Sequence, residues 1–322
     1  MLFINNEVIY LIDTRESMTA KICSFVRAYH SNYGKHKIFD DYLAYDMMGK
    51  EEYEEIEQLI EHEFDAFGFD LSTGFTGKRI YSLLDQYVSP IPLSRIAYAE
   101  RELEYFSKKH EECQYVICGA GMDTFAFRNE NPNIRIFELD HPDTQRYKLE
   151  RIKQLEWTIP ENVRYVSVDF SQDDLATVLE EAGLDPVFPT FFSILGVMYY
   201  LTLPVFEQTI KKIADISGPG NKIVFDYPDE TTFQANTPAR VRLLTEITAK
   251  LGETMKQGFS FENIREALER HSFLVEAHLN PEKIQSVFFN GRMDAQRAFE
   301  NVHFVSAIKN EKKATKQTIY LM

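Results

Sequence analysis

Cysteine is scarce in this chain of 322 residues, and the three that occur, Cys23, Cys113 and Cys118, form no CxxC or other metal-binding spacing. So few scattered cysteines in a chain of this length are typical of reduced, mostly buried thiols rather than of a disulfide framework. His141 and His303 likewise belong to no cluster with metal-ligand spacing. We therefore predict no metal site and a cytoplasmic protein.

Long hydrophobic runs and positive charge are also lacking. No apolar run approaches the length that spans a membrane, and the first residues lack the basic and apolar segments of a signal peptide. Lys and Arg number 35 against 50 Asp and Glu, a net charge of −15. Because such a field repels phosphate backbones and anionic lipid, we predict neither a nucleic acid nor a membrane as partner. The oligomeric state stays open.

What the chain does contain is typical of a globular α/β protein. Up to about residue 110 the apolar spacing predicts helices, including 19–28, 51–65 and one that opens at Ser89-Pro90 and runs to about Lys109. After residue 227 the pattern predicts helices near 240–256 and 260–270. Two late strands, 273–278 and 303–308, are close enough in sequence to form an antiparallel pair at a sheet edge.

Between these two parts, short apolar runs alternate with helical stretches. The runs are 115–118, 134–139, 163–168, 191–195 and 222–225, and the helices lie near 143–155, 172–181 and 204–216. This alternation predicts a doubly wound, parallel sheet whose ligand lies at the carboxyl ends of the strands. We expect three regions: a helical N-terminal cap or lid (1–112), a core (113–310) with a helical insertion at about 228–270, and a C-terminal tail (311–322).

Three features at successive predicted strand ends indicate a nucleoside ligand. Gly119-Ala120-Gly121 follows the first strand, where glycines permit a tight turn and the close approach of a ligand. Asp140 ends the second strand, at the spacing of an acid that binds ribose hydroxyls. Asp169-Phe170 ends the third, where the carboxylate can accept from an adenine amine while the ring packs on the base. Each feature alone is more often a tight turn or a helix cap.

A nicotinamide-dependent oxidoreductase is one alternative, but Thr124 stands where the third glycine of GxGxxG would be. A second alternative is a non-catalytic nucleoside-binding sensor or scaffold that keeps the pocket. A tRNA-modifying enzyme is disfavoured by the net charge of −15.

Longer motifs give a specific resemblance. The stretch 114–128 (QYVICGAGMDTFAFR), with FELDHP at 137–142, VDF at 168–170, LGVMYYL at 195–201, FDY at 225–227 and FFNGRMD at 288–294, resembles the leucine carboxyl methyltransferase superfamily. The most similar branch is that of the bacterial polyketide-type O-methyltransferases. The likeness runs from about Ser17 to Lys309. It implies a Rossmann-like class I methyltransferase fold with a mostly parallel seven-stranded sheet, an antiparallel edge hairpin and an N-terminal helical lid.

The resemblance also implies the cofactor, S-adenosylmethionine, and the residues that hold it. Arg95 matches an arginine that binds the methionine carboxylate, a role suited to a guanidinium because it can contact a carboxylate at two points. The glycines would face the methionine and ribose part, Asp140 the ribose, and Asp169 with Phe170 the adenine. The full cofactor set expected is Arg95, Gly119, Ala120, Gly121, Asp140, His141, Asp169, Phe170, Leu195 and Gly196.

Two residues depart from the family pattern, and the first of them narrows the class of acceptor. Leu195 stands where the leucine-carboxyl branch has a glutamate, which argues against protein-phosphatase carboxyl methylation, and Ala97 stands where many relatives have an arginine. The catalytic residues are unknown, with Tyr98, Tyr199, Tyr200 and Arg292 as candidates to contact the acceptor. No His–acid pair is visible, which favours a small-molecule carboxylate or acidic phenol as acceptor of an O-methyltransferase.

Overall fold

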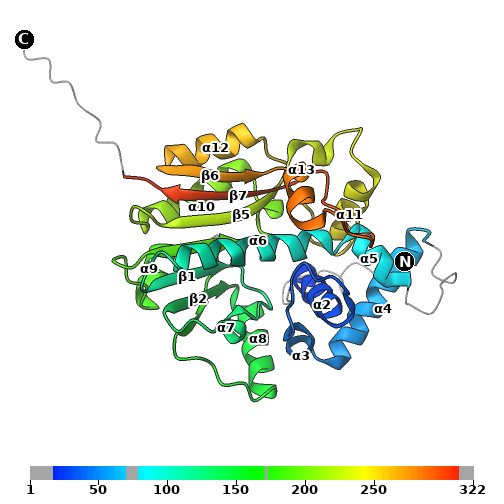
Figure 1. Cartoon of the computed structure of the whole chain (residues 1–322), viewed down its shortest axis with the longest axis horizontal. Helices are drawn as coiled ribbons and strands as arrows, with labels where there is room; N and C mark the ends of the chain where they lie inside the picture. The colour runs from blue at the N-terminus through cyan, green and yellow to red at the C-terminus, as the bar shows by residue number, and fades with distance from the viewer. Residues whose placement is uncertain (1–16, 70–78, 171–172, 312–322) are drawn as a thin grey trace, which may run out of the picture.

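The computed structural model describes residues 17–69, 79–170 and 173–311, and within these ranges helices surround one seven-stranded sheet (Figure 1). The strands are β1 (Cys113–Cys118), β2 (Ile134–Asp140), β3 (Val163–Ser167), β4 (Thr190–Ile194), β5 (Lys222–Pro228), β6 (Phe273–Leu279) and β7 (Val302–Lys309). Their order is β3-β2-β1-β4-β5-β7-β6, and β7 is antiparallel to both of its neighbours while the other pairs are parallel. This confirms the predicted sheet and its antiparallel edge hairpin.

The order of the strands reverses between β1 and β4. From β1 the chain builds outward to β2 and β3, and it then returns to place β4 on the other side of β1. Because the connections leave in opposite directions there, a crevice opens at the carboxyl ends of β1 and β4. The topology therefore fixes where a ligand can bind.

Side chains alternate between the two faces of the sheet and bury one core on each. On β1, Tyr115 and Ile117 belong to the core under α6 (Pro90–Ser107), whereas Val116 and Cys118 belong to the opposite core. The opposite face is covered by α9 (Leu175–Glu181), α10 (Leu203–Asp215) and α12 (Phe261–Arg270). A strand covered on both faces reads as a continuous apolar run, which is why these strands could be located in the sequence.

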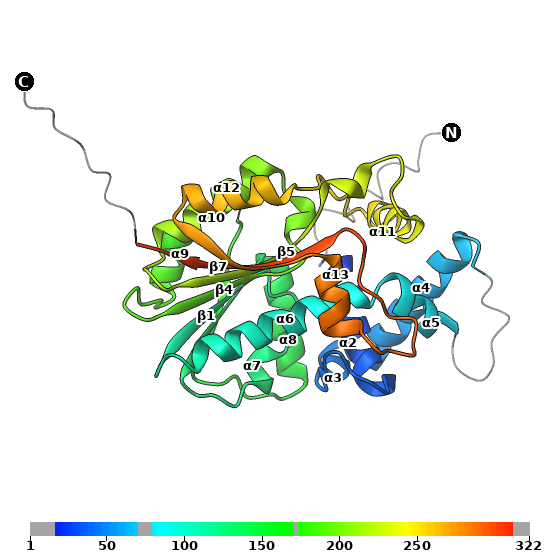
Figure 2. The same ribbon diagram turned by 45° about the horizontal axis from the view of Figure 1, so that its top comes forward.

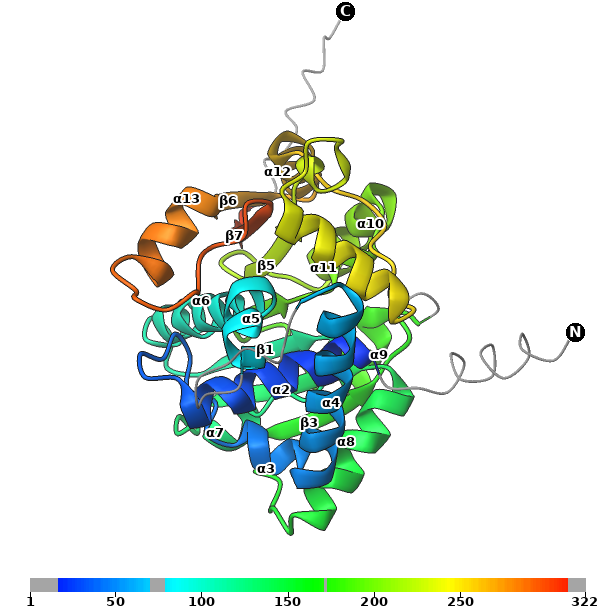
Figure 3. The same cartoon turned by 90° about the vertical axis from the view of Figure 1, so that its right-hand side faces the viewer.

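The N-terminal helices gather beyond the carboxyl ends of the parallel strands (Figures 1 and 2). They are α2 (Met18–Tyr33), α3 (Ala44–Met48), α4 (Lys50–Ala66) and α5 (Arg79–Tyr87). These helices share an apolar cluster of their own, which contains Phe25, Tyr53, Phe64 and Leu84. Figure 3 shows α11 (Ala239–Lys250), from the late part of the chain, at the same end of the molecule as α2 and α4.

The remaining helices are short or lie at the periphery. They are α7 (Phe125–Arg128), α8 (Pro142–Gln154), α13 (Pro281–Ile284), the 3₁₀ segments Met198–Tyr200 and Glu230–Phe233, and the π-helical segment Gln285–Phe289. Residues 171 and 172, part of one predicted helix, lie outside the described ranges. In the residues described, no helix combines the length and apolar character needed to cross a bilayer.

Two predicted helix ends are wrong. The helix expected at 19–28 continues to Tyr33, and Gly34 follows it as the C-cap. The helix expected at 240–256 ends at Lys250, because Gly252 takes a left-handed backbone conformation (φ +83°) just beyond it. The chain then turns back, and Glu253 and Met255 reach the cavities described below. The three-region division at residues 112 and 310 stays a prediction.

Candidate active site

A cavity of about 380 Å³ opens at the carboxyl ends of β1 and β4. The end of β1 and the glycine loop after it (residues 117–123) form part of its lining, together with residues of α2, α6 and the loop after β4. Sites that hold small molecules and cofactors typically have volumes of about 300–1,000 Å³. The crevice created by the strand order is therefore large enough for a ligand.

The glycine loop takes a backbone conformation that larger residues rarely adopt. Gly119 and Gly121 have φ values of +77° and +52°, a backbone conformation that other residues rarely adopt. A Cβ on Gly119 would lie 3.0 Å from Cγ2 of Val197. The two glycines thus keep the backbone of the loop accessible at the cavity.

Asp140, the last residue of β2, lies beside this loop and lines the cavity. Its carboxylate accepts hydrogen bonds from the N–H groups of Gly121 (2.5 Å) and His141 (2.7 Å), one on each oxygen. Burial raises the pKa of Asp140 above its usual value, although these two N–H groups act in the opposite direction. A carboxylate offers about four acceptor positions, so further positions remain for ligand hydroxyls.

Arg95 on α6 is held by a carboxylate from β5. Its Nη1 lies 3.3 Å from Oδ2 of Asp226, a side chain that is fully buried. The same carboxylate accepts from the N–H of Gly196 (2.7 Å) and from the hydroxyl of Tyr199 (2.8 Å). A Cβ on Gly196 would lie 2.5 Å from Nη2 of Arg95, so a larger residue there would displace the guanidinium.

Buried polar contacts fasten the N-terminal helices to the glycine loop. Arg27 on α2 contacts Oδ2 of Asp41 at 2.6 Å and donates to the carbonyl of Met122 at 2.8 Å. The hydroxyl of Thr124 donates to the other oxygen of Asp41 (2.5 Å). Thr124 therefore connects the loop to the N-terminal segment, at the position where a dinucleotide fingerprint would need glycine.

Glu253 and the start of α2 contact each other at the cavity. The carboxylate of Glu253 accepts from the hydroxyl of Ser17 and from the N–H of Thr19, both at 3.0 Å, at the start of α2. All three residues line the cavity. Segments more than 230 residues apart in sequence thus meet over the crevice.

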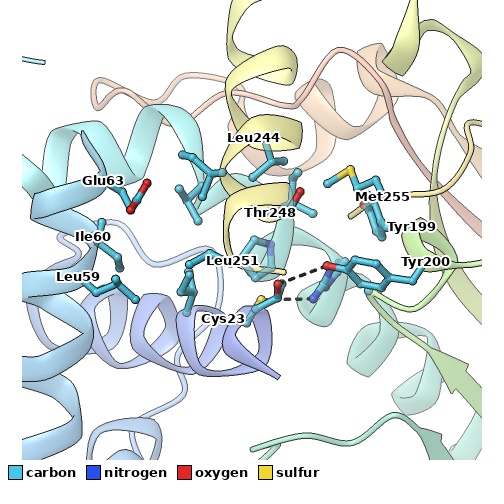
Figure 4. A pocket seen from close by; sticks show the side chains of 18 of the residues that line it. Cys23, Leu59, Ile60, Glu63, Tyr199, Tyr200, Leu244, Thr248, Leu251 and Met255 are labelled. Atoms are coloured by element: carbon cyan, nitrogen blue, oxygen red, sulfur yellow. Dashed lines mark hydrogen bonds between the residues drawn. The ribbon is translucent and has the colours of Figure 1, made fainter. Parts of the chain in front are cut away.

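A second cavity of about 80 Å³ adjoins the first (Figure 4). The residues that line both, and so mark the junction between them, are Thr19, Cys23, Pro92, Arg95, Gly196 and Tyr200. Beyond the junction, the walls of this smaller chamber are mostly apolar and include Ile22, Leu59, Ile60, Phe64, Val88, Ile91, Leu244, Ile247, Leu251 and Met255.

The thiol at the junction and the phenols at and beside it are poor proton acceptors near neutral pH. Burial raises the pKa of the Cys23 thiol, against the opposing effect of Arg95 and Arg27. Burial also raises the pKa of Tyr200 to about 12 and that of Tyr199 well above its usual value. The thiol and both phenols are therefore protonated at pH 7.

The sequence model of the family described as leucine carboxyl methyltransferase matches residues 20–214, more than half of the chain. The chain belongs to this family. A relative from Bacillus subtilis (strain 168), named "Putative S-adenosyl-L-methionine-dependent methyltransferase YktD", is 37% identical over 305 residues, which cover 91% of this chain and 98% of the relative. A Rhodococcus jostii (strain RHA1) protein under the same description, RHA1_ro00605, is 32% identical over 41% of this chain and 46% of its own length.

A solved structure supports the fold. A protein of the duf574 family from Streptomyces avermitilis MA-4680 superimposes with a TM-score of 0.58 at 13% identity, covering 92% of this chain and 99% of its own. Membership of the leucine carboxyl methyltransferase family makes the chain a methyltransferase and overturns the oxidoreductase alternative. It also bears out the predicted cofactor, S-adenosylmethionine. Assignment to the polyketide branch stays a prediction.

Most residues expected to bind the cofactor of this methyltransferase come together at the larger cavity. They are Arg95, Gly119, Ala120, Gly121, Asp140, Leu195 and Gly196. Their chemistry suits the cofactor, since the loop leaves backbone exposed, Asp140 has acceptor positions to spare and Arg95 offers a guanidinium.

Three expected residues do not line this cavity. His141 is the N-cap of α8, where its ring accepts from the N–H of Asp143. Asp169 follows β3, and its N–H donates to Asp173. Phe170 packs against the core on the α9 and α10 face. Their predicted contacts with the cofactor stay untested.

Two of the four acceptor candidates lie elsewhere. Tyr98 is buried and stacks on Phe304 of β7, because its position on α6 faces the sheet rather than the cavity. Arg292 pairs with Asp294 (2.5 Å) and lines neither cavity. Tyr199 and Tyr200 do line the chamber, and the hydroxyl of Tyr200 lies 3.4 Å from Oγ1 of Thr19.

Sequence reasoning assigned no role to several residues that line or support the site. Asp226 belongs to the FDY motif, one of those that resemble the family, and directly follows the predicted strand 222–225. That position could have marked it as a site residue. The sequence gives no such signal for Cys23, Glu63 and Glu253, because their place at the cavities depends on how distant helices pack. In the described residues no group of three His, Cys, Asp or Glu side chains is arranged to hold a metal.

Proposed function

We propose that this methyltransferase is an O-methyltransferase that acts on an acceptor oxygen already ionised at neutral pH, the carboxylate or acidic phenol of a small molecule. The observation that carries the proposal is the lack, among the residues that the structure describes, of a free base at the junction of the two cavities: burial raises the pKa of Cys23 and Tyr200. The carboxylates of Asp226 and Glu253 nearby already accept hydrogen bonds from protein donors. An un-ionised phenol or alcohol needs a base within hydrogen-bond reach. An ionised acceptor needs only to be positioned and stripped of water.

S-adenosylmethionine supplies an electrophilic methyl carbon bound to a positive sulfur. An acceptor oxygen donates a lone pair to that carbon, the carbon–sulfur bond breaks and its electrons stay on sulfur, so no proton has to be removed. Holding two reactants in line can contribute about 7–11 kcal/mol to lowering the barrier. The apolar walls of the chamber exclude water from the acceptor.

The roles of individual residues are part of the proposal. Arg95 would bind the methionine carboxylate while Asp226 fixes the plane of its guanidinium. Asp140 would accept from the ribose hydroxyls while Gly121 and His141 hold it in place. Glu253 and the start of α2 would cover the bound cofactor.

The test is a transfer assay with a deuterated methyl donor at pH 7. A panel of small carboxylic acids, acidic phenols and simple alcohols is analysed by mass spectrometry for the labelled methyl ester or ether. We expect product from acids or acidic phenols and none from alcohols. Cys23→Ser should retain transfer, because the thiol is not the base.

A non-catalytic sensor is the competing function. It predicts that the cofactor binds in calorimetry but that no acceptor of any class is methylated. Methylation of alcohols as fast as of carboxylates would contradict the proposed ionised acceptor, since it would require a base that the junction lacks.

A further inference from the structure

The smaller chamber joins the junction at one end and a carboxylate at the other. Figure 4 shows Tyr200 at the end near Cys23 and Glu63 of α4 at the opposite end. Leu244 and Thr248 of α11, and Leu251 directly after this helix, lie between them. Apolar side chains thus connect the site of transfer with an acidic group. A ligand that fills the chamber must suit both ends.

An ion pair lies at each end of the chamber, and the two ends differ in which partner of the pair lines it: Arg95 at the junction and Glu63 at the far end. At the junction, Arg95 is the cation and the buried Asp226 already pairs with it. At the far end, Glu63, whose side chain is one-fifth exposed, pairs at 3.6 Å with Lys250, whose side chain is half exposed. Lys250 does not line the chamber, and its ammonium lies over the ring of Phe67 at 3.9 Å. A ligand group that reaches the far end therefore meets a negative side chain.

We infer that the chamber is the acceptor subsite, and that it selects a monocarboxylic acid with an uncharged, apolar body while rejecting dicarboxylic acids. This rests on the proposed function and names its substrate class. The single acidic group lies at the junction, and the apolar body extends toward Ile60 and Leu244. A second carboxylate would be desolvated among apolar walls beside Glu63, which is unfavourable on both counts.

The first measurement varies the length of the acceptor's alkyl chain and uses only the native enzyme. Straight-chain carboxylates from butanoate to decanoate are compared by kcat/KM for methyl ester formation. Each methylene that enters the chamber should raise kcat/KM about three- to fourfold until the chamber is full, after which the gain stops. Because the apolar walls end at Glu63, the plateau should come within this series.

The second measurement tests whether the chamber discriminates against a second negative charge on the acceptor. The native enzyme should prefer octanoate to octanedioate by at least about 100-fold. Glu63→Gln removes the charge at nearly constant shape and should reduce that preference about tenfold. The matched control is Glu55→Gln, on the exposed side of the same helix, which should leave the preference unchanged.

Binding separates this inference from the proposed function. Octanoate is titrated calorimetrically into the protein loaded with S-adenosylhomocysteine, the demethylated product. Binding that tightens with chain length and weakens for octanedioate, without methyl ester formation, would overturn the proposed function and keep the acceptor subsite. Ester formation with no dependence on chain length, or with octanedioate accepted as well as octanoate, would overturn the subsite and keep the function.

Discussion

Nη1 of Arg95 lies 3.3 Å from Oδ2 of Asp226, although the two residues are 131 positions apart and Asp226 is fully buried. The contact joins α6, which lies over one face of the sheet, to the last part of β5. The same carboxylate accepts from the N–H of Gly196 in the loop after β4. Asp226 therefore sets the position of both the guanidinium and the loop on which our cofactor assignment depends.

Asp226→Asn should destabilise the protein by about 3 kcal/mol and weaken cofactor binding, because it leaves the buried Arg95 without its anion. The control is Tyr199→Phe, which removes one donor to the carboxylate and should cost about 1 kcal/mol. Denaturant unfolding measures stability, and calorimetry with S-adenosylhomocysteine measures binding. Native-like values in both experiments would show that Asp226 supports neither.

Arg95→Lys should lose at least about tenfold in cofactor affinity despite keeping the charge, since an ammonium cannot reproduce a planar two-point contact. Decarboxylated S-adenosylmethionine should bind the native enzyme weakly and distinguish little between it and Arg95→Ala. The two losses should be strongly non-additive, because both remove one interaction. Additive losses would mean that Arg95 does not contact the cofactor carboxylate.

Asp140→Ala should weaken cofactor binding more than tenfold, given about 1.5–3 kcal/mol for each hydrogen bond to a charged group. Helix α8 should persist, because His141 rather than Asp140 is its N-cap. Asp143→Ala is the control, because it removes a partly exposed carboxylate from the first turn of α8 and should leave affinity near native. A mutant of Asp140 that melts early yet binds normally would assign this carboxylate to the support of the glycine loop alone.

His30 should make stability depend on pH on the acid side. Its buried ring accepts from the N–H of Ile38 (2.9 Å), and burial, reinforced by Arg292 and Lys37, lowers the pKa of His30 to about 4, while Asp294 and Asp40 oppose this. The unfolded chain takes up a proton near pH 6.5 and the folded protein does not. Stability present above pH 6.5 is therefore lost as the pH falls toward 4, by about 2–3 kcal/mol.

The comparison that isolates this effect is between the native protein and His30→Gln, unfolded by denaturant from pH 7.5 to 4.5. Burial raises the pKa of nearby Asp85 to about 6, so that carboxyl contributes the opposite slope in part of the same range and must be present in both proteins. We expect the variant to lose less stability on acidification. Parallel curves for the two proteins would contradict the assignment.

Much of the core could be read directly from the sequence. Strands covered on both faces, such as β1 and β4, must be apolar throughout, and the glycines at 119 and 121 punctuate the first of them. Local patterns of this kind depend only on neighbouring residues, and they were sufficient to predict the sheet. Combined with the motifs, they also located seven residues that line the larger cavity.

The tertiary structure alone decided which of these residues meet and what surrounds them. Tyr98 and Tyr199 looked alike as aromatic candidates, yet one faces the sheet and the other lines the chamber. Glu63 and Leu244 lie on helices that belong to opposite parts of the chain, and nothing local indicates that they share a cavity. The reason is physical: backbone periodicity is set by near neighbours, whereas a pocket is the space left when distant elements pack, and its charge depends on partners such as Asp226.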